Sequence, residues 1–233
     1  MAAYFDVSQL ASPHPEYVCW LDVMGTQATM FRSVKIAANF VCKLHDAVLV
    51  HKEVLDGKGR LHPMLDGLYI TCESQHTLKE FLSNVFLVLA HTFISEMEPH
   101  HQFLVRGCIA YGPIYTGDDI TENASKRLYK EESYRAGLLL GMPITQAYRG
   151  ESHAPPFGLF IDESARAFAP PDEEPFPFIW WRWLPKHDET TLEPSMRGAL
   201  LRYFRWQLAH SRMTGYEVDR IKEHCRLAKE YWS

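Results

Sequence analysis

Hydrophobic and polar positions along this chain follow two different periods, and each period predicts a type of element. Residues 17–21 form a run of aromatic and aliphatic side chains, which predicts a buried strand. Over 31–55 the apolar residues return at helical spacing until the turn sequence 56–59, which predicts one long helix. The chain is therefore expected to begin with a strand, a turn at Gly25 and a helix capped by Thr26.

The middle of the chain predicts two hairpins separated by a helix. Residues 60–73 read as two short strands joined at Asp66–Gly67, a dipeptide that favours hairpin turns. Residues 77–98 carry an apolar stripe typical of a core helix. Residues 103–115 predict the second hairpin, with Arg106 inside an apolar strand. A buried arginine needs a partner, and either a structural salt bridge or a bound phosphate or base would supply one.

The rest of the chain alternates polar connections with shorter elements. Pro143 suits the start of a helix on which Thr145 and Arg149 lie about one turn apart. Arg182 stands among three tryptophans, and it is expected to stack on aromatic neighbours. The other expected elements are a polar loop or short helix at 117–135, strands at 157–163 and 178–184, a proline-rich loop at 169–177, and helices at 191–212 and 216–232.

Composition narrows the class of protein. The 233 residues are 46% hydrophobic and 23% charged, which is typical of a globular protein, and we expect one domain with a core at 16–184 and a helical extension at 190–233. The formal charge of −5 argues against non-specific binding to nucleic acid. Five scattered cysteines predict neither a disulfide framework nor a thiolate zinc site, and they fit a cytoplasmic location. Neither a signal peptide nor a membrane span is expected, because no apolar run reaches about 18 residues.

Two aspartates are candidates for metal chemistry. Asp22 follows the first predicted strand, and Asp66 lies in the first predicted hairpin. Carboxylates at such positions can hold a divalent cation, although turn chemistry alone also explains each of them. Their combination favours a metal site.

Four separated segments within 16–184 resemble, in order, the motifs of the class III nucleotidyl cyclases. Each motif alone is a weak signal, whereas four motifs in the family's order argue against an accidental resemblance. Residues 20–26 resemble F-x-D-I-x-G-F, 64–67 resemble I-G-D with Leu65 in place of glycine, 106–112 resemble R-x-G-I-x-x-G, and 141–151 resemble G-D-x-V-N-x-A-x-R-x-E.

This resemblance implies a fold, a site and a partner. The fold would be α+β, with a ferredoxin-like, mostly antiparallel central sheet packed with helices, followed by C-terminal helices. The active unit would be a homodimer in which each site takes aspartates from one subunit and the helix arginine from the other. The implied roles are two Mn²⁺ or Mg²⁺ ions on Asp22, Asp66 and the Val23 carbonyl, phosphoryl stabilisation by Arg149 with Thr145 at the asparagine position, and triphosphate or base contacts by Arg106, His62 and Arg182.

Departures from the motifs bear on the substrate. The lysine and aspartate of purine-selecting relatives are replaced by His62 and Leu138. The chain is most similar to the pyrimidine cyclases of bacterial Pycsar anti-phage systems. This resemblance implies a uridylate cyclase with UTP as substrate, or CTP as the alternative, and an effector that responds to cyclic UMP or cyclic CMP. A purine cyclase, a nucleotide-binding module without turnover, and another two-metal phosphotransferase or phosphohydrolase remain alternatives.

Overall fold

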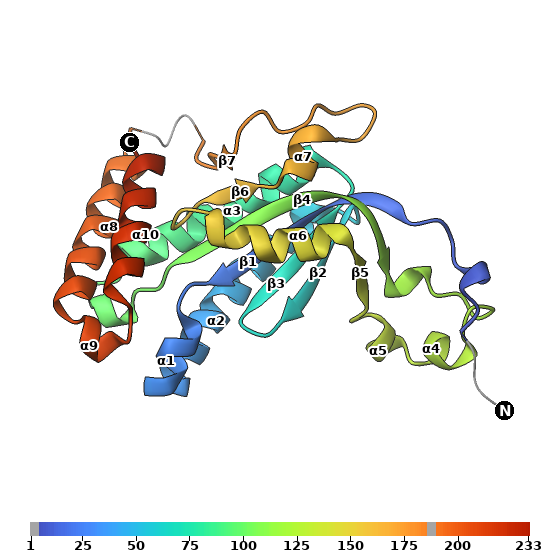
Figure 1. Cartoon of the computed structure of the whole chain (residues 1–233), viewed down its shortest axis with the longest axis horizontal. Coiled ribbons are helices and arrows are strands. Elements are labelled where there is room, and N and C mark those ends of the chain that lie inside the picture. The colour runs from blue at the N-terminus through green and yellow to red at the C-terminus, as the bar shows by residue number, and fades with distance from the viewer. Residues whose placement is uncertain (1–4, 186–189) are drawn as a thin grey trace.

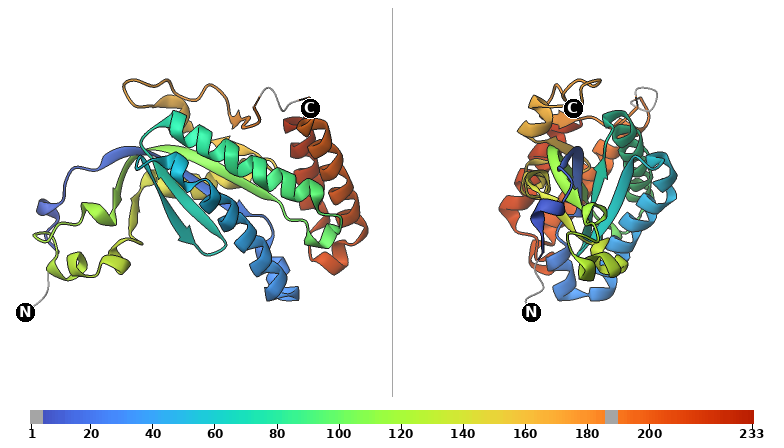
Figure 2. Two further views of the ribbon diagram at one scale, coloured as in Figure 1. Left: turned by 180° about the vertical axis from the view of Figure 1, so that it is seen from behind. Right: turned by 90° about the vertical axis from the view of Figure 1, so that its right-hand side faces the viewer.

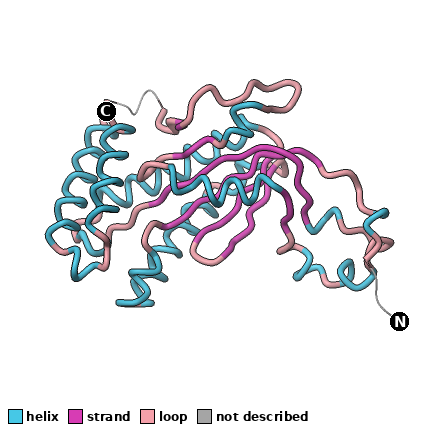
Figure 3. Tube along the Cα trace, in the orientation of Figure 1, coloured by secondary structure: helices cyan, strands magenta, loops and turns pink. Residues whose placement is uncertain are grey.

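The computed structural model describes residues 5–185 and 190–233, and its centre is one mixed sheet (Figures 1 and 3). The strand order is β2-β3-β1-β4-β6-β7, with β5 paired to β4. Only the β4–β6 pair is parallel among the strand pairs of these residues. The predicted α+β class with a mostly antiparallel sheet is therefore confirmed. The strands are β1 His14–Val23, β2 Gly59–Met64, β3 Gly67–Cys72, β4 Val105–Thr116, β5 Leu139–Gly141, β6 Leu159–Ile161 and β7 Trp180–Trp181.

Helices cover both faces of this sheet and one of its ends (Figures 1 and 2). Short 3₁₀ turns connect several of them, at Val7–Gln9, Lys52–Leu55, Pro99–His101, Gly117–Asp119 and Glu151–His153. The helices are α1 Thr26–Arg32, α2 Val34–Val50, α3 Gln75–Ser95, α4 Lys126–Lys130, α5 Glu132–Arg135, α6 Met142–Gly150, α7 Glu163–Ala167, α8 Leu192–Ala209, α9 Ser211–Thr214 and α10 Val218–Tyr231.

Strand β1 is buried on both faces because successive side chains point to opposite sides of a strand. Tyr17, Cys19 and Leu21 belong to the large hydrophobic cluster, which also contains buried residues of α2 and α3. Val18 and Trp20 belong to a smaller cluster with Ala147 of α6. In Figure 2 α2 and α3 cross the back of the sheet, whereas Figure 1 shows α6 in front. The central strand thus separates two layers of helices.

Helix α3 is long and apolar enough, by length and composition, to cross a membrane. Its apolar residues are interrupted by polar and charged ones, among them Lys79, Glu80 and Asn84, so the expectation that no apolar run reaches about 18 residues holds for this helix. Ten of its 21 residues are buried, among them Phe81, Leu82 and Phe86 at the centre of the large cluster. Burial against the sheet accounts for its composition, because a core helix needs a broad apolar surface.

The C-terminal helices α8, α9 and α10 pack at one end of the sheet (Figure 1). Helix α8 contacts α3, and α10 packs on α8. Trp183 and Trp232 anchor this end in the large cluster, with their indole nitrogens donating to the Phe157 and Pro156 carbonyl oxygens at 2.8 and 3.3 Å. Residues 190–233 are therefore helical as predicted, and they extend the core of the sheet.

The predicted long helix at 31–55 is wrong, because Ser33 interrupts it. Ser33 is extended, with φ −161, and its hydroxyl accepts from the Ile36 amide at 3.3 Å, so it ends α1 and caps α2. The cap of α1 also differs from the expectation. Gly25 is the N-cap, with φ 76, while the Thr26 hydroxyl donates to the Val23 carbonyl at 2.7 Å.

The predicted hairpin at 103–115 is one continuous strand. All ten residues of β1 pair with β4, so the Gly112–Pro113 dipeptide lies inside the ladder and makes no turn. A long central partner strand has overridden the local turn signal. The expected strand at 178–184 shortens to the two residues of β7, and the one at 157–163 divides into β6 and the start of α7.

The first hairpin is where the sequence predicts it, but its glycine has another role. The turn residues are Leu65, with φ 54, and Asp66, while Gly67 already pairs with Met64 and Asp22. A side chain at Gly67 would overlap the Leu21 carbonyl oxygen and lie 2.8 Å from the Trp20 ring. Gly67 therefore permits β3 to approach β1 closely.

We expect Gly67→Ala to lower the free energy of unfolding by about 1–3 kcal/mol, because the added methyl group forces β1 and β3 apart. The matched control is Gly198→Ala in α8, where the nearest atom to an added Cβ is Arg202 Nη1 at 3.5 Å. This control should be stabilised by roughly 0.5–1 kcal/mol. Urea denaturation of the two variants measures both values, and a neutral Gly67→Ala would contradict the close approach.

Candidate active site

The candidate site lies at the end of β1, where three strands place charged residues side by side. Asp22 pairs with Arg106 of β4 on one side and with Gly67 of β3 on the other. Paired residues of neighbouring strands share a face, so Asp22 and Arg106 project toward the side that α6 covers. Asp66 immediately precedes Gly67 in the β2–β3 turn. The sheet thus brings Asp22, Asp66 and Arg106 together from three segments of the sequence.

Glu151 completes this group and is the salt-bridge partner that Arg106 needs. Arg106 Nε donates to Glu151 Oε1, and the two side chains are only 14% and 12% exposed. Gly150 lets α6 end this close to β4, because a Cβ there would lie 2.5 Å from Cys108 Sγ. The structure thus contains the salt bridge that was one of the two alternatives for Arg106, beside the candidate metal ligand, and its triphosphate or base contact stays a prediction.

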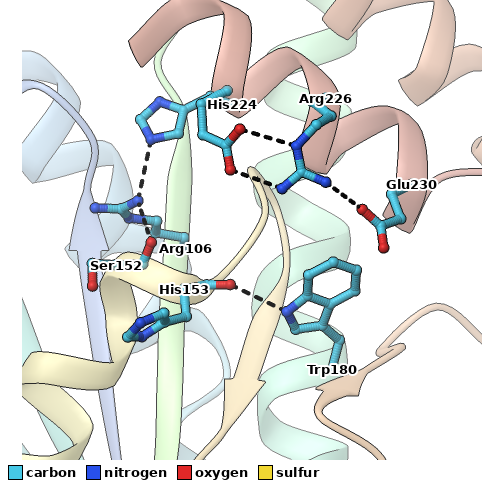
Figure 4. Close-up of polar contacts among 8 residues, drawn as sticks. Arg106, Ser152, His153, Trp180, His224, Arg226 and Glu230 are labelled. Atoms are coloured by element: carbon cyan, nitrogen blue, oxygen red, sulfur yellow. Dashed lines mark hydrogen bonds and ion pairs between the residues drawn. The ribbon is translucent and has the colours of Figure 1, made fainter. Parts of the chain in front are cut away.

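Two further contacts fix the same guanidinium group (Figure 4). Arg106 Nη1 donates to the Ser152 carbonyl oxygen at 3.4 Å and contacts His224 Nε2 of α10 at 3.4 Å. The other ring nitrogen of His224 makes a hydrogen bond with the Tyr216 hydroxyl. Burial, together with the charges of Arg106 and Arg220, lowers the pKa of His224 to about 4, so the imidazole is neutral and accepts the bond from Arg106.

Asp22 carries an electrostatic cost in this setting. Burial raises the pKa of its carboxyl group well above the usual range, and the negative charges of Glu151 and Asp66 raise it further. The positive charge of Arg106 acts in the opposite direction. A cation at Asp22 would relieve this cost, since it would neutralise the carboxylate charge that the surroundings disfavour.

The residues present fit a divalent ion that a substrate completes. Within 5–185 and 190–233 no group of three or more His, Cys, Asp or Glu side chains forms a ready metal cage. Mg²⁺ is usually held by one or two carboxylates, with waters and substrate phosphates filling the other positions, so Asp22 and Asp66 suffice. The Val23 carbonyl accepts one hydrogen bond, from Thr26 at 2.7 Å, and keeps a second lone pair.

Thr145 and Arg149 lie on the exposed side of α6, opposite the buried Ala147. Among the described residues neither side chain makes a hydrogen bond or ion pair, and neither is among the groups that shift the pKa of Asp22. A single subunit therefore leaves both outside the Asp22 group. Their catalytic roles stay predictions.

His62 and Arg182 also lie apart from the Asp22 group. His62 is buried on β2 opposite Tyr69. Its pKa is lowered mainly by burial and also by the positive charge of Arg60. Its Nε2 has no hydrogen-bond partner within the described residues. Arg182 donates to Glu193 Oε1 at 3.2 Å and lies 5.8 Å from the Tyr231 ring centroid. Arg182 thus lies over the aromatic ring of Tyr231 of α10, in agreement with the expected stacking on an aromatic neighbour, and its substrate contact stays a prediction.

Sequence reasoning missed two classes of residue at this site. Glu151 is the last position of the 141–151 motif, so its spacing from Arg149 was a usable signal. Tyr216, in the connection between α9 and α10, and His224 of α10 lie outside the motif-bearing region, and no local pattern marks them.

Comparison with known proteins gives structural similarities only. No family model matches the sequence, and no curated protein matches it. Among solved structures, the chain is similar to the dimeric guanylyl cyclase domain of the RhoGC fusion protein from the aquatic fungus Blastocladiella emersonii (15% identity, TM-score 0.45, 68% of this chain and 84% of that one). It is also similar to adenylate cyclases from Trypanosoma brucei (14%, 0.47, 78% and 81%) and to the guanylate cyclase domain of RhGC from Catenaria anguillulae in complex with GTP (15%, 0.45, 66% and 81%). At these low identities and TM-scores, we base the function on the residues of this chain.

Divalent metal should stabilise this protein through Asp22. At a Mn²⁺ concentration near 100 times Kd, we expect the melting temperature of the wild type to rise by roughly 5–10 °C. Asp22→Asn should lose most of this rise, whereas Asp46→Asn, at an exposed position of α2, should keep it. Thermal melts with and without Mn²⁺ measure the shift, and an equal shift in all three proteins would contradict the assignment.

The metal-free proteins provide a second readout. Because the pKa of Asp22 is raised by folding, its stability contribution falls as pH rises from the unfolded value of about 4 toward the folded value. Asp22→Asn lacks this loss, so the variant should be more stable than the wild type at neutral and alkaline pH and not at acidic pH.

Proposed function

We propose that this protein is a nucleotidyl cyclase that converts a pyrimidine nucleoside triphosphate, UTP or CTP, into the 3′,5′-cyclic monophosphate and pyrophosphate. One observation carries the proposal. Asp22 at the end of β1 and Asp66 in the adjoining β2–β3 turn lie near the fixed guanidinium of Arg106, at the positions that the cyclase motifs assign to metal and phosphate groups.

The reaction is an intramolecular phosphoryl transfer. The ribose 3′-oxygen forms a bond to the α-phosphorus, the bond from that phosphorus to the bridging oxygen of the β-phosphate breaks, and the hydroxyl proton leaves to solvent. Two divalent ions, when bound, would lower the pKa of the hydroxyl and neutralise phosphate charge. Asp22 and Asp66 would hold these ions, and the Val23 carbonyl would add an oxygen ligand.

A second subunit would supply the remaining groups. Thr145 and Arg149 are exposed and unpaired among the described residues, which is the state expected of side chains that act on a partner's site. Arg149 would stabilise negative charge on the transferring phosphoryl group, an effect worth about 10³-fold or more in related chemistry. The hydroxyl of Thr145 would replace an amide in positioning the ribose.

The choice of a pyrimidine rests on the groups at the base-reading positions. His62 is buried, with a lowered pKa, and Leu138 is aliphatic, so neither position offers the charged group of purine-selecting relatives. The cyclic product would then act on a separate effector protein, in the manner of the anti-phage systems that the sequence resembles.

Product identification tests the reaction and the base together. We expect purified protein with Mn²⁺ or Mg²⁺ to form cyclic UMP or cyclic CMP, detected by mass spectrometry after separate incubations with UTP, CTP, ATP and GTP. Asp22→Ala and Asp66→Ala should lose turnover by about 10³-fold or more, with circular dichroism unchanged, because metal binding fails. Asp46→Asn serves as the control.

Each other product identifies a different alternative. Cyclic AMP or cyclic GMP would retain the cyclase and overturn the argument from His62 and Leu138. A linear mononucleotide would indicate a phosphohydrolase, and nucleotide binding without any product would indicate a binding module.

A mixing experiment tests the shared site. Asp66→Ala and Arg149→Ala proteins should each be inactive, but their mixture should recover about a quarter of wild-type activity. When the subunits of equal amounts of the two proteins exchange at random, half of the dimers contain one subunit of each kind. Each such dimer has one intact site of its two, so about a quarter of all sites are intact. No recovery, with subunit exchange demonstrated by differently tagged chains, would contradict the composite site.

A further inference from the structure

A cavity of about 410 Å³ lies between the turn that follows β1 and the C-terminal helices. We call it the α1–α10 cavity, after the helices on its two sides. A Cβ atom placed on Gly215, between α9 and α10, would lie 3.8 Å from the Cβ atom of Ala28 in α1. The two sides of the cavity therefore approach each other closely at this point. The residues used below line it from both sides: Met24, Gly25, Arg32, Arg106, Glu217 and Arg220.

The α1–α10 cavity is rich in positive charge. Arg32, Arg106 and Arg220 line it, against the single carboxylate of Glu217. Arg220 Nε lies 3.6 Å from Glu217 Oε2, and both side chains are more than two-thirds exposed, which makes this a weak surface pair. Arg32 makes no hydrogen bond or ion pair within the described residues. At least two guanidinium groups are therefore available to a ligand.

Arg106 is held in a fixed position at the inner wall. Its Nε and Nη1 atoms bond Glu151, Ser152 and His224, while Nη2 makes no hydrogen bond within 5–185 and 190–233. Preorganised arginine donors suit phosphate oxygens, because the planar fork matches their spacing. The neutral His224 of α10 accepts from Arg106 without adding a competing charge.

The position of the α1–α10 cavity relates it to the two aspartates. Met24 and Gly25 line it, and they directly follow Asp22 and Val23 in the chain. If one phosphate of a polyphosphate chain binds through metal at Asp22, the next phosphates along the chain would extend into the α1–α10 cavity. Arg32 and Arg220 would then meet the phosphates farthest from the nucleoside.

We infer that the α1–α10 cavity binds the terminal phosphates of a polyphosphate ligand, with Arg32 and Arg220 as direct ligands beside Arg106, so that the C-terminal helices form one wall of the site. The inference rests on the proposed function for the identity of the whole substrate. It does not depend on turnover, because a pyrophosphate group alone has the chemistry that these arginines recognise.

Titration with inorganic pyrophosphate in the presence of EDTA tests the inference directly. We expect the wild type to bind pyrophosphate, and Arg32→Gln and Arg220→Gln each to weaken binding about tenfold or more, since each removes charge-assisted hydrogen bonds. The matched control is Arg226→Gln, also on α10, whose guanidinium bonds Glu223 and Glu230 at 2.8 Å outside the cavity (Figure 4). Its affinity should equal that of the wild type.

The outcomes separate this inference from the proposed function. Absence of binding to the wild type, or equal affinity in all four proteins, overturns it. Pyrophosphate binding that depends on Arg32 and Arg220 supports it even when no cyclic nucleotide is formed. If the protein is an active cyclase, Arg220→Gln should raise KM for the triphosphate and weaken product inhibition by pyrophosphate, and unchanged values of both would overturn the inference while leaving the activity in place.

Discussion

The buried ion pair between Arg106 and Glu151 joins the parts of this molecule that build the site. Removing two charges from water is costly, so the pair persists only because its geometry and its extra hydrogen bonds repay that cost. Those bonds come from the 3₁₀ turn that follows α6, through Ser152, and from α10, through His224. Strand β4, helix α6 and the C-terminal helices are thereby held in one arrangement around Asp22. Disturbing β4 or the segment that carries Glu151 would leave a buried charge unpaired, and disturbing α10 would remove one hydrogen bond of Arg106.

This arrangement sets the charge balance of the site. Asp22, Asp66 and Glu151 supply three carboxylates against the one guanidinium of Arg106. The excess of negative charge on the aspartate side favours cations, whereas the arginines of the α1–α10 cavity favour anions. A metal-bound polyphosphate contains both kinds of charge in one ligand. The two halves of the site are therefore complementary to a single class of molecule.

Local patterns predicted most elements of the core, and they placed Asp22 at a strand end and Asp66 in a hairpin turn. This was possible because strand ends, glycine turns and helical stripes depend on residues that are neighbours in the sequence. They failed where a distant partner decided the outcome. Gly112–Pro113 looks like a turn but lies in β4, since pairing with all of β1 overrides it. Ser33 breaks a helix that the apolar spacing alone predicts as continuous. His224 carries no local mark, because its importance comes from meeting Arg106 across 118 positions of the chain.

That separation has a consequence for the order in which the site is built. Closing a long loop costs chain entropy before its contacts give anything in return, so contacts between distant residues form late in folding. The β2–β3 hairpin and its pairing with β1 involve far shorter separations, and they place Asp22 and Asp66 early. The contact of His224 with Arg106 is therefore expected to be among the last to form at the site, after the strand pairing that brings Asp22 and Asp66 together.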